Sequence, residues 1–370
     1  MIYLDYSAST PVDKRVLKYF NAVSIHVIGN ANSIHKLGNA CENLVEESEK
    51  KILHLLGLSY EQFEIIFTSG ASEANNLAIK GLSSAYPNKK HIIMTSFEHS
   101  TVIYPINELK AQGYEVDVLH LKSDGLIDVD ELRSKIRQDT LLVTILAVNS
   151  ELGIHQPLEE IASIVKEYPG VIFHSDATQS IGKVKFDLNS LDLISCSAHK
   201  IYGIKGVGAL IKRRNIHLNS LISGGSTHHA GRSGTPAHPL IASFAFALEL
   251  MMKNFDQHEK KVKTLNRYLH QAIDHLPHVV VNSNDYSIPQ IINISVLGKP
   301  SLDTMHYLEQ KDIYISTYTA CSSKLSQSKS VLALTGDSNR AQTSVRISLS
   351  HLTTKKELDC LIQALKDWTL

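Results

Sequence analysis

Short apolar segments alternate with helical segments along much of the chain, and each apolar segment ends in polar residues. These segments cover residues 63–68, 91–95, 141–148 and 171–175, and two more flank a glycine-rich turn within residues 192–210. Apolar strands separated by helices are typical of a mostly parallel sheet that helices cover on both faces. The sequence therefore predicts an α/β fold.

Polar side chains follow the predicted strands at the points where the strands end. In open parallel sheets, ligands bind beyond the carboxyl ends of the strands. A helix cap or a turn would explain each of these residues alone, but several at one sheet edge favour a ligand site. The residues are His99, Asn149, Asp176, Gln179 and Lys200.

Lys200 stands at the end of a predicted buried strand, which is an unusual place for a lysine. Desolvating an ammonium group is costly unless the group is paired or neutral. A Schiff base with pyridoxal phosphate (PLP) avoids that cost, and Ser197 and His199 are polar neighbours that could contact the phosphate. Residues 69–72, a glycine turn before a helix, provide a second candidate anion site. A lysine in a polar surface turn is the alternative that this stretch alone leaves open.

Composition narrows the class of protein. The 370 residues include 37 basic and 37 acidic ones, and this balance argues against a protein that coats nucleic acid or a membrane surface. No apolar run reaches the roughly 18 residues of a membrane helix, and the start does not resemble a signal peptide. The four scattered cysteines, without a C-x-x-C pair, favour free thiols over a zinc site. We therefore expect a soluble cytoplasmic enzyme or binding protein without a metal.

The C-terminal part of the chain has a different order of predicted helices and strands. A helical region over residues 239–275 leads to strands near residues 290–296 and 313–317, which predicts a smaller α/β portion. A serine-rich segment that extends through Ser330 contains Cys321, and we expect this segment to be an exposed loop. An exposed thiol near a lysine suits a reactive thiolate better than a core position.

Taken together, the motifs resemble the NifS-like cysteine desulfurases, which belong to the class V aminotransferase family of fold-type I PLP enzymes. The resemblance extends over nearly the whole chain. It implies a large PLP-binding domain over residues 16–250, with a mostly parallel sheet of the seven-stranded type, and a small α/β domain from residues 1–15 and 251–370. The matching stretches are residues 3–11, 67–76, 98–100, 149–153, 176–180, 198–200, 232–235, 320–323 and 344–349.

The same resemblance implies how the cofactor is held. Lys200 would form the Schiff base, Asp176 would pair with the pyridine nitrogen, and His99 would stack on the ring and assist proton transfers. Gln179 would hydrogen-bond the ring oxygen, and Asn149 would assist. The phosphate would be bound by Ala71, Ser72, Ser197, His199 and, from a partner subunit, Thr235.

For the substrate, the resemblance implies that Arg346 binds the carboxylate of L-cysteine with its planar fork, assisted by Asn149. Cys321 would attack the substrate sulfur and become a persulfide, and L-alanine would be released. The persulfide would supply iron–sulfur cluster assembly or tRNA thiolation. We therefore expect a homodimer that meets a sulfur-acceptor protein, with no direct contact to nucleic acid or membrane.

Two alternatives stay open at the level of sequence. One is a selenocysteine lyase or another class V PLP enzyme. The other is a desulfurase-derived scaffold that binds a sulfur-transfer partner without catalysis, because Ser226, Thr227 and His228 interrupt the family's glycine loop. The intact set of site residues favours an enzyme.

Overall fold

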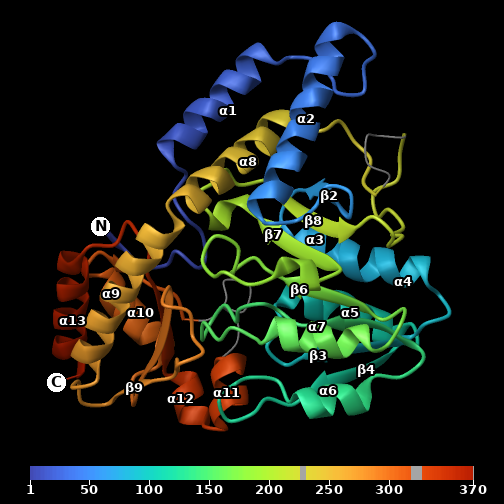
Figure 1. The fold of residues 1–370 in the computed structure, drawn as a ribbon. Coiled ribbons are helices and arrows are strands. Elements are labelled where there is room, and N and C mark those ends of the chain that lie inside the picture. Colours follow the sequence, from blue (N-terminus) through green and yellow to red (C-terminus); the bar gives the residue numbers. More distant parts are fainter. Residues whose placement is uncertain (226–230, 318–326, 370) are drawn as a thin grey trace.

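The computed structural model describes residues 1–225, 231–317 and 327–369 (Figure 1). Its main sheet contains the strands β2 (Phe63–Thr68), β3 (His91–Thr95), β4 (Glu115–Leu119), β5 (Thr140–Thr144), β6 (Ile172–Asp176), β7 (Leu193–Ser197) and β8 (Gly208–Arg213). The seven strands have the order β2-β8-β7-β6-β5-β3-β4. Only β8 pairs antiparallel with its neighbours, so the predicted α/β class with a mostly parallel sheet is confirmed.

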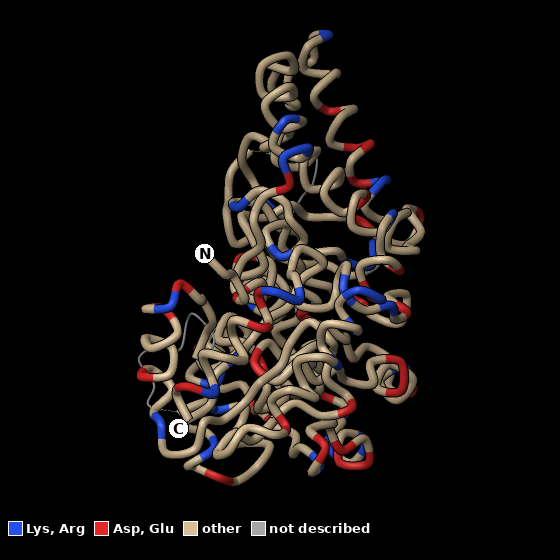
Figure 2. Tube along the Cα trace, turned by 90° about the vertical axis from the view of Figure 1, so that its left-hand side faces the viewer, with Lys and Arg blue, Asp and Glu red and all other residues tan. Residues whose placement is uncertain are grey.

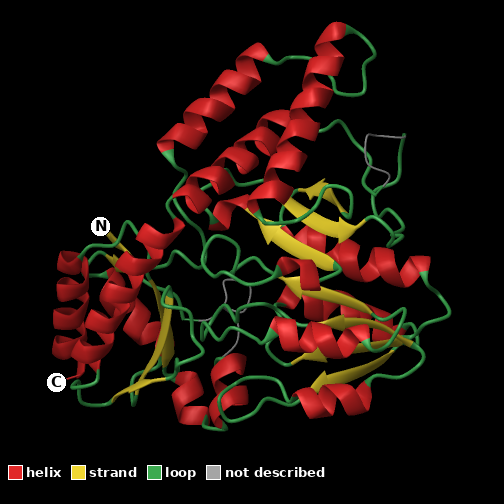
Figure 3. Cartoon of the chain, viewed as in Figure 1, coloured by secondary structure: helices red, strands yellow, loops and turns green. Residues whose placement is uncertain are grey.

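Helices cover both faces of this sheet, because its central strands are apolar on both sides (Figure 3). In β7, for example, Leu193 and Ile194 pack into different hydrophobic clusters. The cluster around Ile194 includes residues of α2 (Lys36–Leu55), α6 (Val129–Lys135), α7 (Leu158–Lys166) and α8 (His238–Lys253). The cluster around Leu193 includes residues of α3 (Ala71–Asn76), the π-helical turn η1 (Leu77–Gly81), α4 (Leu82–Ala85) and α5 (Ser100–Ala111).

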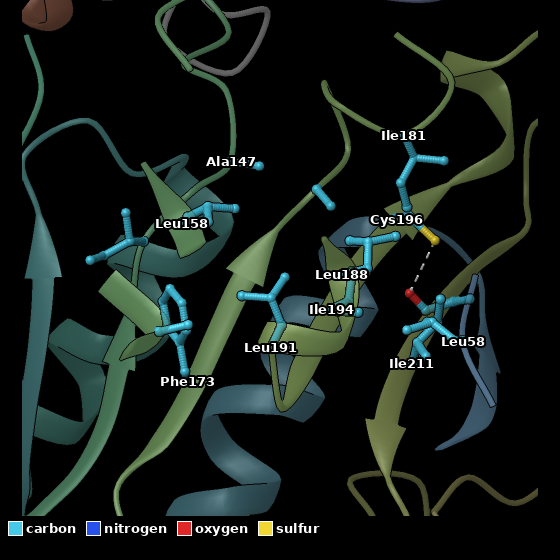
Figure 4. Packing of buried hydrophobic residues seen from close by; sticks show 14 of the residues in the cluster. Leu58, Ala147, Leu158, Phe173, Ile181, Leu188, Leu191, Ile194, Cys196 and Ile211 are labelled. Carbon is cyan, nitrogen blue, oxygen red and sulfur yellow. Dashed lines mark hydrogen bonds between the residues drawn. The ribbon is translucent and has the colours of Figure 1, made fainter. Parts of the chain in front are cut away.

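Figure 4 shows part of the first cluster, which includes Phe173, Leu191, Ile194 and Cys196. The thiol of Cys196 lies 3.7 Å from the carbonyl oxygen of Ala209. Burial raises the pKa of this thiol to about 12. Cys196 is therefore an inert core residue, because the reactive form of a cysteine is the thiolate.

The predicted elements agree well with the structure where the hydrophobic pattern is strong. The strands predicted over residues 63–68 and 91–95 coincide with β2 and β3. The predicted helical region over residues 239–275 divides at Asn254 into α8 and α9 (Phe255–Ile273). The edge strand β4 was not predicted, since it alternates apolar and charged residues and lacks the continuous apolar character of a buried parallel strand.

A smaller part of the molecule contains two short sheets. One is antiparallel with the order β12-β10-β9, and in the other β1 pairs parallel with β11. Leu4 packs into the core of this part, so the N-terminal strand joins C-terminal elements. The domain boundaries at residues 16 and 250 stay predictions. The elements are β1 (Ile2–Tyr3), β9 (Val279–Val281), β10 (Ile291–Val296), β11 (Ile313–Tyr314), β12 (Ser344–Ser348), α10 (Ser301–Glu309) and α13 (Lys355–Thr369).

The helices α11 (Lys329–Thr335) and α12 (Ser338–Gln342) carry residues that pack against Phe97 and Leu146, which follow strands of the main sheet. This packing corrects the prediction that an exposed loop extends through Ser330. Ser328 and Ser330 are buried, and the Ser328 hydroxyl caps α11 by accepting from the Val331 N–H group. Serine is common both in loops and at helix N-termini, so composition alone could not separate the two.

Basic and acidic residues are interspersed along the trace (Figure 2). Within the residues that the structure describes, no helix has the length and apolar character needed to cross a membrane. The helix α1 (Lys14–His26) packs on α8 and leads into α2 (Figure 1).

Candidate active site

The carboxyl ends of several main-sheet strands surround a cavity of about 590 Å³. Parallel strands bring these ends to one edge, which explains why residues far apart in sequence meet there. The N-terminal segment at Ser7–Ser9 closes one side of the cavity. Most of the predicted site residues line it: Ala71, Ser72, His99, Asp176, Gln179, Ser197, His199, Lys200 and Arg346.

Lys200 lies on the 3-10 turn η3 (Ala198–Lys200), which directly follows β7. Its Nζ donates to the carbonyl oxygens of Ser7 at 2.5 Å and Ala8 at 2.9 Å. The amine is thus held inside the site by the N-terminal segment. This position excludes the alternative of a lysine in a solvated surface turn.

Asp176 is connected to His99 through two residues that sequence reasoning missed as site residues. Its carboxylate accepts from the Asn75 Nδ2 at 2.8 Å, and the same nitrogen donates to the Thr101 hydroxyl at 2.9 Å. Thr101 in turn lies 2.8 Å from the His99 Nδ1. Burial, together with the charge of Lys200, lowers the pKa of His99, and Asp176 opposes this only in part. A neutral imidazole therefore faces the cavity.

One end of the cavity suits an anion. Helix α3 begins at Ala71 and has no side-chain cap among the described residues, so N–H groups of its first turn are available to a ligand. Lys205, which was not predicted, also lines the cavity. Burial, followed by the charges of Lys200, Lys205 and Lys183, lowers the pKa of His199 to about 4.

Arg346 of β12 brings a second cationic group to the cavity. Its guanidinium donates to the Ser150 carbonyl oxygen at 2.9 Å and to an Asp5 carboxylate oxygen at 2.8 Å. The side chain is 2% exposed. Its buried Nε has no hydrogen-bond partner within the described part of the chain. Asp5 and Ser150 therefore hold the guanidinium in place at the wall of the cavity.

Three of the predicted residues do not line this cavity in the described structure. Asn149 uses its Oδ1 to accept from the N–H groups of Glu151 and Leu152, and so it shapes the turn that contains Ser150. Thr235 lines a neighbouring cavity of about 130 Å³, which shares Ser69 and Gly206 with the larger one. Cys321 lies outside the described residues, as do Ser226, Thr227 and His228.

The side chains present fit PLP. The helix start and Lys205 suit the phosphate, the Asp176 carboxylate suits a protonated ring nitrogen, and the Lys200 amine suits the aldehyde. No group of three metal-ligating side chains forms among residues 1–225, 231–317 and 327–369.

Glu98 is a buried carboxyl group beneath this site. Its Oε1 accepts from the Leu146 N–H group at 2.8 Å and the Thr95 hydroxyl at 3.1 Å, whereas its Oε2 has no partner among the residues described. Burial, with a smaller contribution from the negative charge of Asp176, raises the pKa of Glu98 to about 8. The folded protein therefore favours the neutral carboxyl group.

This shift predicts how stability changes with pH. Between the unfolded pKa of about 4.3 and the folded pKa, the folded chain binds more protons at Glu98 than the unfolded chain does. Stability therefore falls as the pH rises through that window, and Glu98→Gln should remove the fall. We expect the free energy of unfolding of the wild type, relative to Glu98→Gln, to drop by about 1–3 kcal/mol between pH 5 and pH 9 in urea titrations. Glu47→Gln, at an exposed position, is the control, and equal pH slopes in wild type and Glu98→Gln would contradict the prediction.

Comparison with known proteins agrees with this geometry. The family model described as Aminotransferase class-V matches residues 2–361. A protein of Arabidopsis thaliana named "Cysteine desulfurase, mitochondrial" is 42% identical, with 98% of this chain and 81% of the relative covered. A protein of Rickettsia bellii named "Cysteine desulfurase IscS" is 38% identical, with 98% of this chain and 89% of the relative covered.

Solved structures are similar over almost the whole length. A structure titled "NIFS-LIKE PROTEIN" has a TM-score of 0.93 at 31% identity. The match covers 99% of this chain and 98% of the chain in that structure. Another structure, titled "SspA in complex with cysteine", has a TM-score of 0.83 at 31% identity. The match covers 96% of this chain and 100% of the chain in that structure.

Proposed function

The chain belongs to the class V aminotransferase family, and from this we infer that it is a PLP-dependent cysteine desulfurase, which forms L-alanine from L-cysteine. The observation that carries the inference is the placement of the Lys200 amine and the Arg346 guanidinium in one cavity with Asp176. An α-amino acid needs a group for its carboxylate and a base for its Cα proton, and in this proposal Arg346 and Lys200 serve these two roles. A similar structure was solved in complex with cysteine.

Different residues of the site would bind different parts of the cofactor. Lys200 would carry PLP covalently, Asp176 would keep the ring nitrogen protonated, and the neutral His99 would pack against the ring. The first turn of α3 with Ser197 would hold the phosphate. When bound, PLP withdraws electrons from the substrate Cα and so acidifies its proton. The direct contacts of Gln179, Asn149 and Thr235 with cofactor or substrate stay proposals.

The chain's own groups then act on the substrate. Arg346 binds the carboxylate, and the neutral Lys200 amine accepts the Cα proton. The Cys321 thiolate attacks the sulfur of the bound cysteine. A sulfur–sulfur bond forms while the substrate Cβ–S bond breaks, and the electron pair left on the substrate is protonated to give alanine. Cys321 is left as a persulfide.

The described residues on either side of the segment that contains Cys321 make hydrogen bonds to Arg346 and to Glu151. Ser316 exchanges two backbone hydrogen bonds with Arg346, at 2.7 and 3.2 Å. At the other end, the Ser328 hydroxyl donates to the Glu151 carboxylate at 2.5 Å. Cys321 follows Thr317 by four residues. Four residues extend over at most about 13–14 Å, and this short connection to Thr317 supports the proposed role of Cys321.

A substrate assay on the purified protein with PLP tests the function. We expect L-cysteine to yield equal amounts of alanine and sulfide in the presence of a thiol reductant. Arg346→Lys should raise the KM for cysteine about 10- to 100-fold, because lysine cannot donate in a planar fork. Arg340→Lys is the control, since Arg340 bonds Asn282 in the smaller part of the molecule.

No alanine from cysteine, or an unchanged KM in Arg346→Lys, would contradict the proposal. A much higher kcat/KM for selenocysteine than for cysteine would instead favour a selenocysteine lyase. A protein that takes up no PLP would favour a binding scaffold.

We propose that the active form is a homodimer. Large apolar side chains are exposed where α1 leads into α2, and a second copy of the chain could cover them. Ile34 is 98% exposed and Ile28 is 72% exposed, with Ile25 and Leu37 nearby in the sequence. In such a dimer, Thr235 could contact the partner's phosphate site.

We propose two possible uses for the sulfur. The persulfide would pass to an acceptor protein for iron–sulfur cluster assembly, which is the main proposal, or for tRNA thiolation. A cytoplasmic location is proposed from the scattered cysteines alone. The similar proteins of Arabidopsis thaliana and Saccharomyces cerevisiae are named mitochondrial.

A further inference from the structure

Two donors of Thr101 converge on one ring nitrogen of His99, the residue that caps α5. The Thr101 backbone N–H group donates to the His99 Nδ1 at 3.3 Å, and the Thr101 hydroxyl lies 2.8 Å from the same atom. A backbone N–H group can only donate, so Nδ1 accepts and carries no proton. In a neutral imidazole the proton is then on Nε2, because the hydrogen bond at one ring nitrogen sets which nitrogen is protonated.

Asn75 determines how the Thr101 hydroxyl is oriented. The Asn75 side chain is fully buried, and its Nδ2 donates to the Asp176 carboxylate at 2.8 Å and to the Thr101 hydroxyl oxygen at 2.9 Å. A carboxylate can only accept, so the nitrogen end of the amide faces Asp176. Because the Thr101 oxygen accepts from Asn75, the single proton of the hydroxyl is left for the His99 Nδ1.

This arrangement decides what the ring can offer to a bound molecule. His99 lines the large cavity together with Asp176 and Lys200. Its basic nitrogen, Nδ1, is engaged by Thr101. The Nε2–H group is therefore the polar group of the ring that is left for a ligand, and this group can only donate.

We propose that Asn75 is a positioning residue that, through the Thr101 hydroxyl, keeps His99 in the tautomer with its proton on Nε2. His99 then donates a hydrogen bond to a bound molecule and does not serve as a base toward it. The base for the Cα proton is in that case Lys200, and in this respect the inference rests on the proposed function.

Nuclear magnetic resonance of the full-length protein, freed of PLP and labelled with ¹⁵N-histidine, tests the tautomer directly. The signals of His99 are identified by their loss in His99→Gln. We expect an unprotonated Nδ1 and a protonated Nε2 in the wild type. A proton on Nδ1 of the neutral ring would overturn the proposal.

Titration of the same nitrogens tests the contribution of Asn75 and Thr101. Burial lowers the pKa of His99, the charge of Asp176 opposes this effect, and the charge of Lys200 adds to it. Hydrogen bonds accepted by Nδ1 also favour the neutral ring, because protonation of that nitrogen breaks them. Loss of the hydroxyl in Thr101→Val should therefore raise the midpoint by about 0.5–1 pH unit. Asn75→Leu should raise it too, since the Thr101 oxygen is then free to accept from a protonated Nδ1.

The other titratable groups near His99 are the same in the wild type and in these variants. The charges of Asp176 and Lys200 act on the ring, and Glu98 precedes it in the chain. The remaining groups of the cavity are His199, Lys205 and Arg346. A difference in the midpoint therefore reports the hydrogen bonds at Nδ1.

Matched variants sharpen the test. Thr101→Ser keeps the hydroxyl, so its midpoint should stay near that of the wild type. Asn76→Leu is the control for Asn75→Leu, because Asn76 is the adjacent asparagine and donates to the Ser72 carbonyl oxygen. If Asn75 acts through Thr101, the double variant Asn75→Leu/Thr101→Val should have the midpoint of Thr101→Val alone. Asn75→Ala replaces Asn75→Leu if leucine prevents folding.

An unchanged midpoint in Thr101→Val or in Asn75→Leu would overturn the proposal, and so would additive shifts in the double variant. A shift in Asn76→Leu as large as in Asn75→Leu would overturn it as well. These measurements need neither cofactor nor substrate. A failure of the desulfurase assay is therefore distinguishable from a failure of this inference.

Discussion

Lys200→Ala is expected to lower turnover of L-cysteine by about 10⁴-fold or more, since it removes the group that we propose both to bind PLP covalently and to accept the Cα proton. The Nζ of Lys200 lies in the cavity and donates to the carbonyl oxygens of Ser7 and Ala8. No other amine among the described residues makes these two contacts. Borohydride reduction followed by mass spectrometry should find PLP on the Lys200 peptide of the wild type and on no peptide of the variant.

The control for this prediction is Lys166→Ala on the exposed face of α7, which should keep full turnover. Thermal unfolding of Lys200→Ala must show a folded protein. A small primary amine added to the variant should restore part of the turnover, because it can supply the missing base. Substantial activity in Lys200→Ala without an added amine would rule out the assigned role.

Cys321→Ala is expected to reduce alanine formation and sulfur transfer by about 10³-fold or more, because the nucleophile for the substrate sulfur is missing. Uptake of PLP should stay normal, since the residues that we propose to hold it are unchanged. Exchange of the cysteine Cα proton with deuterated solvent should also continue, because Lys200 and Arg346 still act on the bound substrate. This combination separates loss of sulfur chemistry from loss of binding.

Cys360→Ala is the matched control for Cys321→Ala. Cys360 is the exposed free cysteine on α13, whereas Cys41 and Cys196 are buried. A thiol reagent would modify the exposed Cys360, so substitution is the better way to test the two cysteines separately. If Cys360→Ala lost sulfur transfer while Cys321→Ala retained it, the assignment of the nucleophile would be wrong.

The polar residues after the strands could be located from sequence because their signal is local. An apolar strand followed by His99, Asp176 or Lys200 can be recognised within a short window, and parallel strands bring such ends to one edge. Arg346 was found only through the resemblance to a family. Its own surroundings predict an ordinary buried strand, and its guanidinium reaches the site because Asp5 and Ser150 hold it there.

Other site residues could not have been found this way, since their partners are distant in sequence. Asn75 is one of two adjacent asparagines in a helix, and only the tertiary structure shows that Asn75 contacts Asp176. Lys183 was indistinguishable from the exposed Lys185 two residues later. The burial of Ser328 and Ser330 likewise depends on contacts with Glu151 and Asn149.

By itself, the sequence determined the α/β class, the main strands and the polar residues at their ends, because hydrophobic periodicity and strand-end polarity arise between near neighbours. The tertiary structure decided which of these side chains share a cavity and which groups set their charge. Burial, followed by the charges of Lys200 and Arg346, lowers the pKa of Lys183, whose Nζ donates to the Gln179 Oε1. That burial and those contacts exist only once the chain has folded.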